Sequence, residues 1–206
     1  LVVGGMIKAG DAPGLYFYNH VSDGDLVGLS LAFGISGSGS GDEFGHALVS
    51  GQDLDGDGLD DLVVGAPSAM LGEETRGAAY IFYSPYRSGL DITDADVVIY
   101  GDDAGDEFGY AMTSLEDWDG DGSIDVVVSS PGADSDSGEA HLFRPMALGD
   151  GTVASALSYT TLGGSGGRLG SAVSALGDLD GDGMAEVTLG APDASTAGAY
   201  LYWSSG

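Results

Sequence analysis

The chain has no cysteine and only 5 basic residues among its 206. The lack of cysteine excludes a disulfide framework and thiolate metal sites, although it does not settle the compartment. The 33 acidic residues bring the formal net charge to −28. Because phosphate contacts need Lys and Arg, this balance argues against nucleic acid as a partner. An anionic membrane surface would repel the chain for the same reason.

Three kinds of segment are also missing from the sequence. No apolar run is long enough to span a bilayer and no secretory signal peptide is present, so we expect no direct insertion into a membrane. No stretch shows a convincing period of 3.6 residues, so we expect almost no helix. The chain begins with Leu1 rather than Met, and we expect a processed chain or a piece of a longer protein.

Acidic residues at alternate positions of glycine-containing loops are the main feature that the sequence does have. The segments 53–61, 117–125 and 178–186 each carry Asp at their first, third and fifth positions and Asp or Glu at the ninth. Carboxylates that converge in a tight turn repel one another unless a cation lies between them. Calcium accepts six to eight oxygen ligands in flexible geometry, so the spacing predicts about three Ca²⁺ ions.

The expected ligands are the four carboxylates of each loop and the backbone carbonyl of its seventh residue. Loop by loop they are Asp53, Asp55, Asp57, Leu59 and Asp61; Asp117, Asp119, Asp121, Ser123 and Asp125; and Asp178, Asp180, Asp182, Met184 and Glu186.

Other interpretations of these loops fit less well. An EF-hand needs a bidentate Glu at the twelfth position and flanking helices, whereas the twelfth residues here are Val64, Val128 and Leu189. Magnesium is disfavoured because it keeps several of its waters. Asp- and Gly-rich turns also form without a metal, but three such loops in phase favour metal binding.

The loops are part of a longer internal repeat. The run Leu62-Val63-Val64-Gly65 has counterparts that begin at residues 1, 126 and 187, at steps of 61, 64 and 61 positions. Four short β-like runs recur per unit, near 44–50, 61–64, 78–83 and 96–100 in the second unit. A period near 62 with four strands per unit is typical of a propeller blade.

We therefore expect an all-β fold, in which four-stranded antiparallel sheets form about three and a half β-propeller blades. The whole chain, 1–206, would be one propeller region. Its blades would span about 1–36 (partial), 44–101, 108–163 and 169–206 (partial). Because the partial blades would leave unpaired sheet edges, we expect the chain to pair with the rest of a longer propeller or with other copies of itself.

The repeat resembles a known family. Phe44-Gly45, the D-x-D-G-D-G-x-x-D loop and Gly65-Ala66-Pro67 together resemble the FG-GAP repeat of the integrin α-subunit β-propeller. The third unit departs from the pattern with Ser129-Ser130-Pro131, and the fourth departs at Leu169 and Glu186. The resemblance implies that calcium is held in the hairpin loop between strands one and two of a blade.

These observations predict a calcium-stabilised scaffold or adhesion protein that is not an enzyme. Calcium loops of extracellular modules bind at about 10⁻⁴ to 10⁻³ M, so we expect an extracellular or cell-surface location, with a protein or a glycan as ligand. Gly163-Gly164-Ser165-Gly166-Gly167 matches a nucleophile elbow by letter, but the segment after it looks like a strand instead of the required helix. Three alternatives stay open: a carbohydrate-binding propeller, the propeller domain of a larger extracellular enzyme, and a subunit of a self-assembling fibre.

Aromatic residues recur at the third strand of each unit. A carbohydrate-binding protein would expose them, but recurrence at one strand position favours packing between blades. The residues concerned are Tyr80, Phe82, Tyr83, Phe143, Tyr200, Tyr202 and Trp203.

Overall fold

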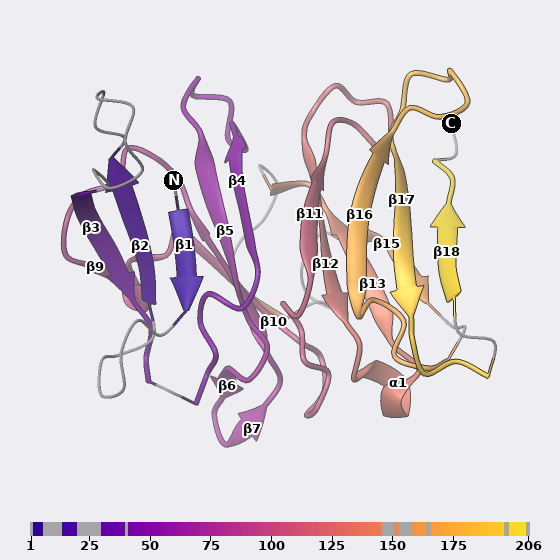
Figure 1. Ribbon diagram of the computed structural model, residues 1–206, viewed down its shortest axis with the longest axis horizontal. Coiled ribbons are helices and arrows are strands. Elements are labelled where there is room, and N and C mark those ends of the chain that lie inside the picture. The colour runs from indigo at the N-terminus through magenta and orange to yellow at the C-terminus, as the bar shows by residue number, and fades with distance from the viewer. Residues whose placement is uncertain are drawn as a thin grey trace.

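The computed structural model describes residues 2–5, 14–19, 30–39, 41–145, 151–152, 158–163, 166–195 and 198–204. These residues form a row of four sheets that stand side by side (Figure 1). Within each sheet the main strands are antiparallel and follow one another in chain order. The all-β propeller-blade architecture expected from the repeats is confirmed.

The strands of each sheet are short and evenly spaced along the chain. The first sheet contains β1 (Val2–Gly5), β2 (Gly14–Asn19) and β3 (Ser30–Ser36). The second contains β4 (Leu48–Gln52), β5 (Asp61–Ala66), β8 (Ala78–Phe82) and β10 (Val97–Tyr100). The third contains β11 (Met112–Leu115), β12 (Asp125–Ser130), β13 (Glu139–Phe143) and β15 (Ser158–Gly163). The fourth contains β16 (Ala172–Gly177), β17 (Glu186–Ala191) and β18 (Gly198–Tyr202).

Smaller elements occupy the connections between these strands. A two-stranded hairpin of β6 (Met70–Leu71) and β7 (Glu74–Thr75) follows β5. The helical elements of the described residues are single turns, η2 (Ile92–Asp94) and α1 (Ala133–Asp136). Asp134 and Ser135 within α1 have positive φ, so α1 is not a regular helix. The expectation of almost no helix is therefore met.

Two very short strands link neighbouring sheets at their outer edges. β9 (Leu90–Asp91) leaves the second sheet and pairs in parallel with β3 of the first. β14 (Gly151–Thr152) likewise comes from the third sheet and pairs in parallel with β10 of the second. The connection between the third and fourth strands thus reaches back to the preceding blade in both cases.

The core lies between the sheets in three apolar layers. Phe44, Val64 and Tyr80 belong to the layer between the first and second sheets. The second layer contains Val63, Phe108 and Phe143, and the third contains Val127, Leu169 and Leu189. Both faces of β5 and β12 are covered, and every residue of these strands is buried. The apolar runs Leu62-Val63-Val64 and Val126-Val127-Val128 suit this burial on both faces.

The Phe-Gly anchor forms a tight turn before the first strand of its sheet. The residues on either side of Phe44 have positive φ, 58° at Glu43 and 91° at Gly45. The same two positions are left-handed around Phe108 and around Leu169. Because this turn occupies residues 41–47, β4 begins at Leu48 and not at Phe44 as the sequence suggested. Leu169 is fully buried, so it serves as the apolar anchor of the fourth unit in place of Phe.

Most of the recurrent aromatic side chains pack between sheets. Tyr80, Phe82 and Phe143 are buried, and the rings of Tyr80 and Phe82 meet Phe44 edge-on at 5.4 and 6.4 Å. Trp203, at the end of β18, is 52% exposed. Packing between blades thus accounts for most of this set.

Candidate metal centres in three hairpin loops

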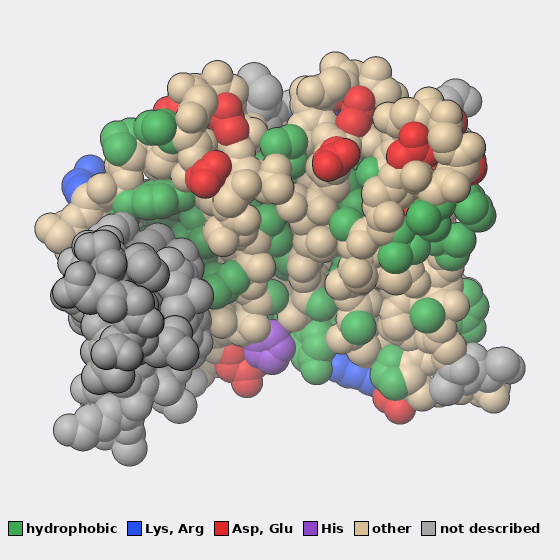
Figure 2. Space-filling model, turned by 45° about the horizontal axis from the view of Figure 1, so that its top comes forward, with side chains coloured by type: hydrophobic (Ala, Val, Ile, Leu, Met, Phe, Trp, Pro, Cys, Tyr) green, Lys and Arg blue, Asp and Glu red, His purple; other side chains and the backbone are tan. Residues whose placement is uncertain are grey.

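The three acidic loops join the first and second strands of the second, third and fourth sheets. All three lie at the same end of the molecule, the upper end in Figure 1. With this end turned forward, Figure 2 shows acidic side chains in separate patches along it. The repeat therefore delivers the three acidic loops to one surface.

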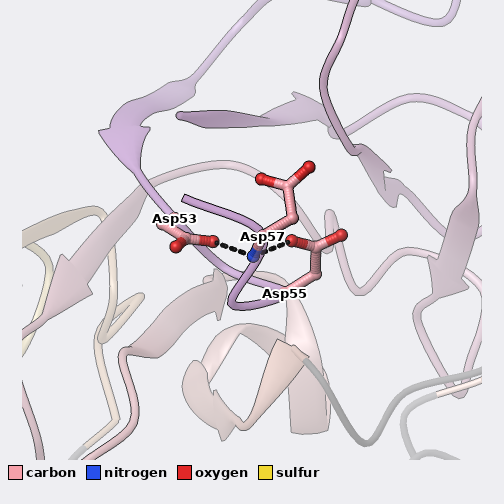
Figure 3. Close-up of side chains that lie close together, drawn as sticks. All are labelled: Asp53, Asp55 and Asp57. Atoms are coloured by element: carbon pink, nitrogen blue, oxygen red, sulfur yellow. Dashed lines mark hydrogen bonds between the residues drawn. The ribbon is translucent and has the colours of Figure 1, made fainter. Parts of the chain in front are cut away.

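Asp53 organises the first loop by accepting backbone hydrogen bonds. Its Oδ1 accepts from the N–H of Gly56 at 2.7 Å and from that of Asp57 at 3.1 Å, and its Oδ2 accepts from Gly58 at 2.8 Å. Asp55 Oδ1 in turn accepts from Asp57 N–H at 3.0 Å. Figure 3 shows the side chains of Asp53, Asp55 and Asp57 around this turn. The backbone thus fixes the direction of each carboxylate.

The ninth residue, Asp61, lies beneath the loop at the start of β5. It is 1% exposed. Its Oδ2 accepts from Leu54 N–H at 2.7 Å, and its Oδ1 accepts from Ser84 N–H at 2.8 Å. Burial raises the pKa of Asp61, while these two backbone hydrogen bonds act in the opposite direction. Asp61 therefore ties the loop to the end of β8.

The same hydrogen-bonding frame recurs in the other two loops. The first Asp, at 117 and 178, accepts from the backbone N–H groups of the fourth and sixth residues. The ninth residue accepts from the N–H of the second, at 2.7 Å in the second loop and 2.6 Å in the third. Glu186 also accepts from the hydroxyl of Ser204 at 3.1 Å. The longer Glu side chain therefore keeps the connection that Asp makes elsewhere.

The structure brings three carboxylates together in each loop, with ligand atoms within 4.8 Å of one another. In the first and third loops these belong to the residues at positions one, three and five. In the second loop Asp125 takes the place of Asp121 in the set. The sets are Asp53, Asp55 and Asp57; Asp117, Asp119 and Asp125; and Asp178, Asp180 and Asp182.

The remaining expected ligands lie at the edges of these sets. Asp61 and Glu186 are buried under their loops, as described above. Asp121 Oδ1 accepts from Ser123 N–H at 2.8 Å. That hydrogen bond, together with the nearby Arg144 guanidinium, holds the pKa of Asp121 below its usual value. Metal ligation by these three carboxylates, by the convergent carboxylates and by the carbonyls of the seventh residues stays a prediction.

Arg144 is a residue of the second loop's surroundings that the sequence argument missed. It directly follows β13, and its guanidinium pairs with both Asp119 and Asp121. The distance from Nε to Asp121 Oδ2 is 2.8 Å. The available signal was an arginine one residue after the third strand, where the second and fourth units have Tyr83 and Trp203.

The chemistry of the donor sets fits a hard divalent cation. Every donor side chain is a carboxylate, and the glycines at the fourth and sixth positions have positive φ, as at Gly56 and Gly58. Calcium accepts such all-oxygen sets in flexible geometry, while softer metals favour imidazole or thiolate. The loops can thus concentrate negative charge around one cation each.

Other features of the described residues offer less for chemistry. A cavity of about 530 Å³ beside the second sheet is lined in part by Asp42, Tyr80 and Tyr100. Another, of about 280 Å³, is lined by acidic side chains and His141. The serine of the Gly163–Gly167 segment lies outside the described residues, so the structure does not test the nucleophile-elbow match.

The acidic pairs before the Phe-Gly anchors have a structural role. Asp42 accepts from the backbone N–H of Ser38 and of Phe44, at 2.9 and 3.3 Å, and Asp106 Oδ2 accepts from Asp103 N–H at 2.9 Å. The glutamate that follows each has positive φ. Both pairs therefore shape turns at the edges of blades.

Repeated antiparallel sheets with an acidic hairpin loop at one end of each define this chain as a β-propeller repeat protein. Two family models match it: the FG-GAP repeat at residues 44–82 and the FG-GAP-like repeat at residues 117–189. The chain belongs to the FG-GAP repeat family of integrin α-like β-propellers.

The relatives of this chain include integrins and an enzyme. It is 33% identical to integrin alpha-PS5 of Drosophila melanogaster over 79% of its length, and 37% identical to human integrin alpha-X over 53%. It is also 39% identical to phosphatidylinositol-glycan-specific phospholipase D of Rattus norvegicus over 43% of its length. The matched regions cover only 16%, 9% and 10% of these relatives. Among the described residues, no helix is long and apolar enough to cross a membrane.

Proposed function

We propose that this chain is a calcium-stabilised extracellular or cell-surface propeller with a scaffolding or adhesive role and no catalytic activity of its own. The observation that carries the proposal is the convergence of three carboxylates, held by one hydrogen-bonding frame, in each of three successive loops. An isolated acidic turn needs no metal, but nothing in the strand framework alone requires the carboxylates to converge three times.

Calcium would act here through the stability of the fold. The convergent carboxylates repel one another, and a bound cation would remove that repulsion and fix the hairpin between the first and second strands. At a free calcium concentration about ten times Kd, each loop would contribute about 1.4 kcal/mol and three independent loops about 4. This sum is comparable to the net stability of many domains, so calcium would supply a large share of the stability of the folded chain.

The location and the role follow from calcium affinity and from the relatives. Loops that bind at about 10⁻⁴ to 10⁻³ M stay filled only where calcium is abundant, which supports an extracellular or cell-surface setting. The integrin relatives support a protein or glycan ligand and pairing with other chains or other parts of a longer protein. A fold alone does not fix a function, so the ligand stays open.

A second candidate function is supported by the match to a phospholipase D. That relative is an enzyme by name, so a propeller of this kind can be one part of an enzyme. In that case this chain would support or position a catalytic domain that lies outside it. This alternative would be favoured if a full-length protein showed enzymatic activity and residues 1–206 alone showed none.

The central test is a melting curve of the purified chain with calcium, with magnesium and with a chelator, combined with metal analysis of the same sample. We expect calcium to raise the melting temperature by several degrees over the chelator, and magnesium to raise it less. About three calcium ions per chain should be found. If the melting temperature is the same in calcium and in chelator and metal analysis finds no calcium, the proposal is wrong.

A further inference from the structure

Five basic residues are all that this strongly acidic chain contains, and one of them is placed against an acidic loop. Arg144 pairs with Asp119 and Asp121 of the second loop. The other arginines pair elsewhere: Arg76 with Glu74, Arg87 with Asp94, and Arg168 with Glu107 and Asp136. Among the described basic residues, Arg144 is thus the one that contacts a candidate metal loop.

The corresponding position in the other blades carries no positive charge. Strand pairing aligns Phe143 with Phe82 and Tyr202, since these three residues pair with Val126, Leu62 and Val187 in their sheets. The residues that follow them are therefore equivalent. They are Arg144 in the second loop's blade, Tyr83 in the first loop's blade and Trp203 in the third's.

The second loop differs from the other two where the arginine binds. In the first and third loops the fifth residue, Asp57 or Asp182, belongs to the convergent carboxylate set. In the second loop the fifth residue, Asp121, is outside the set and is held at 2.8 Å by the Nε of Arg144. The third residue, Asp119, remains in the set but also contacts the guanidinium.

We propose that Arg144 is a built-in competitor for the cation at the second loop, which makes this loop the weakest calcium site and the last to fill. This inference rests on the proposed calcium binding. The guanidinium occupies oxygens of Asp119 and Asp121 and places a positive charge beside any entering cation. Filling the loop therefore requires the arginine to give up both contacts.

The consequence is graded stabilisation by calcium. The first and third loops would fill at lower calcium, while the second would respond only at higher concentrations. Removal of the arginine should raise the calcium affinity of the second loop, because the cation no longer has to displace it. A partly exposed ion pair contributes little free energy, so we expect the increase to be only about three- to tenfold.

The second loop carries its own optical probe. Trp118 is its second residue, is buried, and donates its backbone N–H to Asp125. Only one other tryptophan, Trp203, is present in the chain. In a Trp203→Phe background, terbium emission excited through tryptophan should report the second loop and the neighbouring third loop, whose Ala185 packs in the same apolar layer as Trp118. Displacement of terbium by calcium should then show two phases, and the phase at higher calcium gives the affinity of the second loop.

The experiment compares four chains that share Trp203→Phe: the background alone, Arg144→Gln, Arg144→Lys and Arg87→Gln. Arg87 is the matched control, because it is exposed and pairs with Asp94 outside the loops. We expect Arg144→Gln to tighten calcium binding about three- to tenfold and Arg87→Gln to leave it unchanged. Arg144→Lys should lie between, since lysine keeps the charge but not the two-pronged contact.

Two negative outcomes are distinguishable. If calcium displaces terbium and Arg144→Gln binds no more tightly than the control, Arg144 does not compete and this inference is wrong while calcium binding stands. If neither terbium emission nor calorimetry shows binding to any of the chains, calcium binding itself is wrong. Melting curves recorded in chelator establish that each variant is folded.

Discussion

The backbone N–H of Gly45 donates a hydrogen bond of 3.0 Å to the carbonyl oxygen of Gly65. This bond joins the glycine of Phe-Gly to the glycine of Gly-Ala-Pro. Gly109 and Ser129 form the same pair in the next unit, as do Gly170 and Gly190 in the fourth, each at 3.0 Å. The two sequence anchors recur together because they are partners across the first and second strands of one sheet.

Substitution of Gly65 should disturb the contact between neighbouring blades. A Cβ at this position would lie 2.0 Å from the carbonyl oxygen of Gly109, which belongs to the backbone of the next unit. We expect Gly65→Ala to lower the free energy of unfolding by about 2–4 kcal/mol, because the backbone must shift. Urea denaturation in excess calcium would measure this.

Gly41→Ala is the matched control, since a Cβ there meets nothing within 4 Å. Its effect should stay within about 0.5 kcal/mol. If Gly65→Ala and Gly41→Ala lowered the free energy of unfolding equally, the close approach of the two blades would not restrict the size of the side chain at position 65.

The buried carboxylate of Asp61 should stabilise its loop even without metal. Its two oxygens accept from Leu54 and Ser84, and in Asp61→Asn the amide group would face one of these donors. We expect a loss of about 1–3 kcal/mol in chelator, the usual consequence of an unsatisfied buried group. Asp60→Asn removes the same charge at an exposed neighbour and should have little effect. If Asp61→Asn and Asp60→Asn lost comparable free energy of unfolding, the cause would be the charge of the loop and not the hydrogen bonds of Asp61.

Much of this fold follows from the sequence because the repeat supplies the same evidence several times. The second strand is unbrokenly apolar in two units, and the acidic loop before it marks where the hairpin turns. Strands β5, β8 and β10 accordingly lie within a few residues of their expected positions. The convergence of the carboxylates at positions one, three and five in the first and third loops follows from the spacing for the same reason.

The features that the sequence did not predict depend on contacts between units. β9 and β14 are two residues each, and they become strands only because a neighbouring sheet edge lies beside them. The left-handed φ of Glu43 is unusual for a residue with a side chain and is imposed by the turn before β4. Arg144 is 25 residues away from Asp119, so only the folded hairpin brings them together.

Removal of one expected ligand should weaken calcium binding at a single loop. Asp55→Asn keeps an oxygen to accept from Asp57 N–H but removes one of the three convergent charges. Because calcium affinity follows the charge of the ligand set, we expect roughly a tenfold loss at the first loop by calorimetry. Asp60→Asn lowers the charge of the same loop without touching the set. If both variants bind calcium equally weakly, the loop acts through its overall charge alone.

Acid should destabilise the chain through His141, which lies away from the three acidic loops. Burial lowers the pKa of His141 from 6.5 to about 4, although Asp102 opposes the shift. Between these values the unfolded chain carries a proton on this imidazole and the folded chain does not. Unfolding therefore takes up a proton, and stability falls as the pH drops from about 6.5 to 4, by up to about 3 kcal/mol.

Two carboxylates near His141, those of Glu139 and Asp106, have the opposite dependence. Glu139 lies 3.8 Å from its Nε2, and burial raises the pKa values of both Glu139 and Asp106 in the adjoining cavity. Asp102, Asp103 and Asp134 line the same cavity. Groups with a raised pKa stabilise the folded state at low pH and lose that contribution as pH rises through the folded value. The dependence of wild-type stability on pH is therefore the sum of a histidine contribution that falls in acid and a carboxylate contribution that rises in acid.

The difference between wild type and His141→Gln separates the two contributions. Glutamine does not titrate, so the variant keeps the carboxylate dependence and loses the imidazole dependence. We expect the stability of wild type relative to the variant to decline from pH 6.5 to pH 4, measured by urea denaturation in chelator so that calcium release does not contribute. Parallel profiles over this range would mean that the buried imidazole titrates normally. The decline would instead identify His141 as the group through which this otherwise acidic blade interface senses pH.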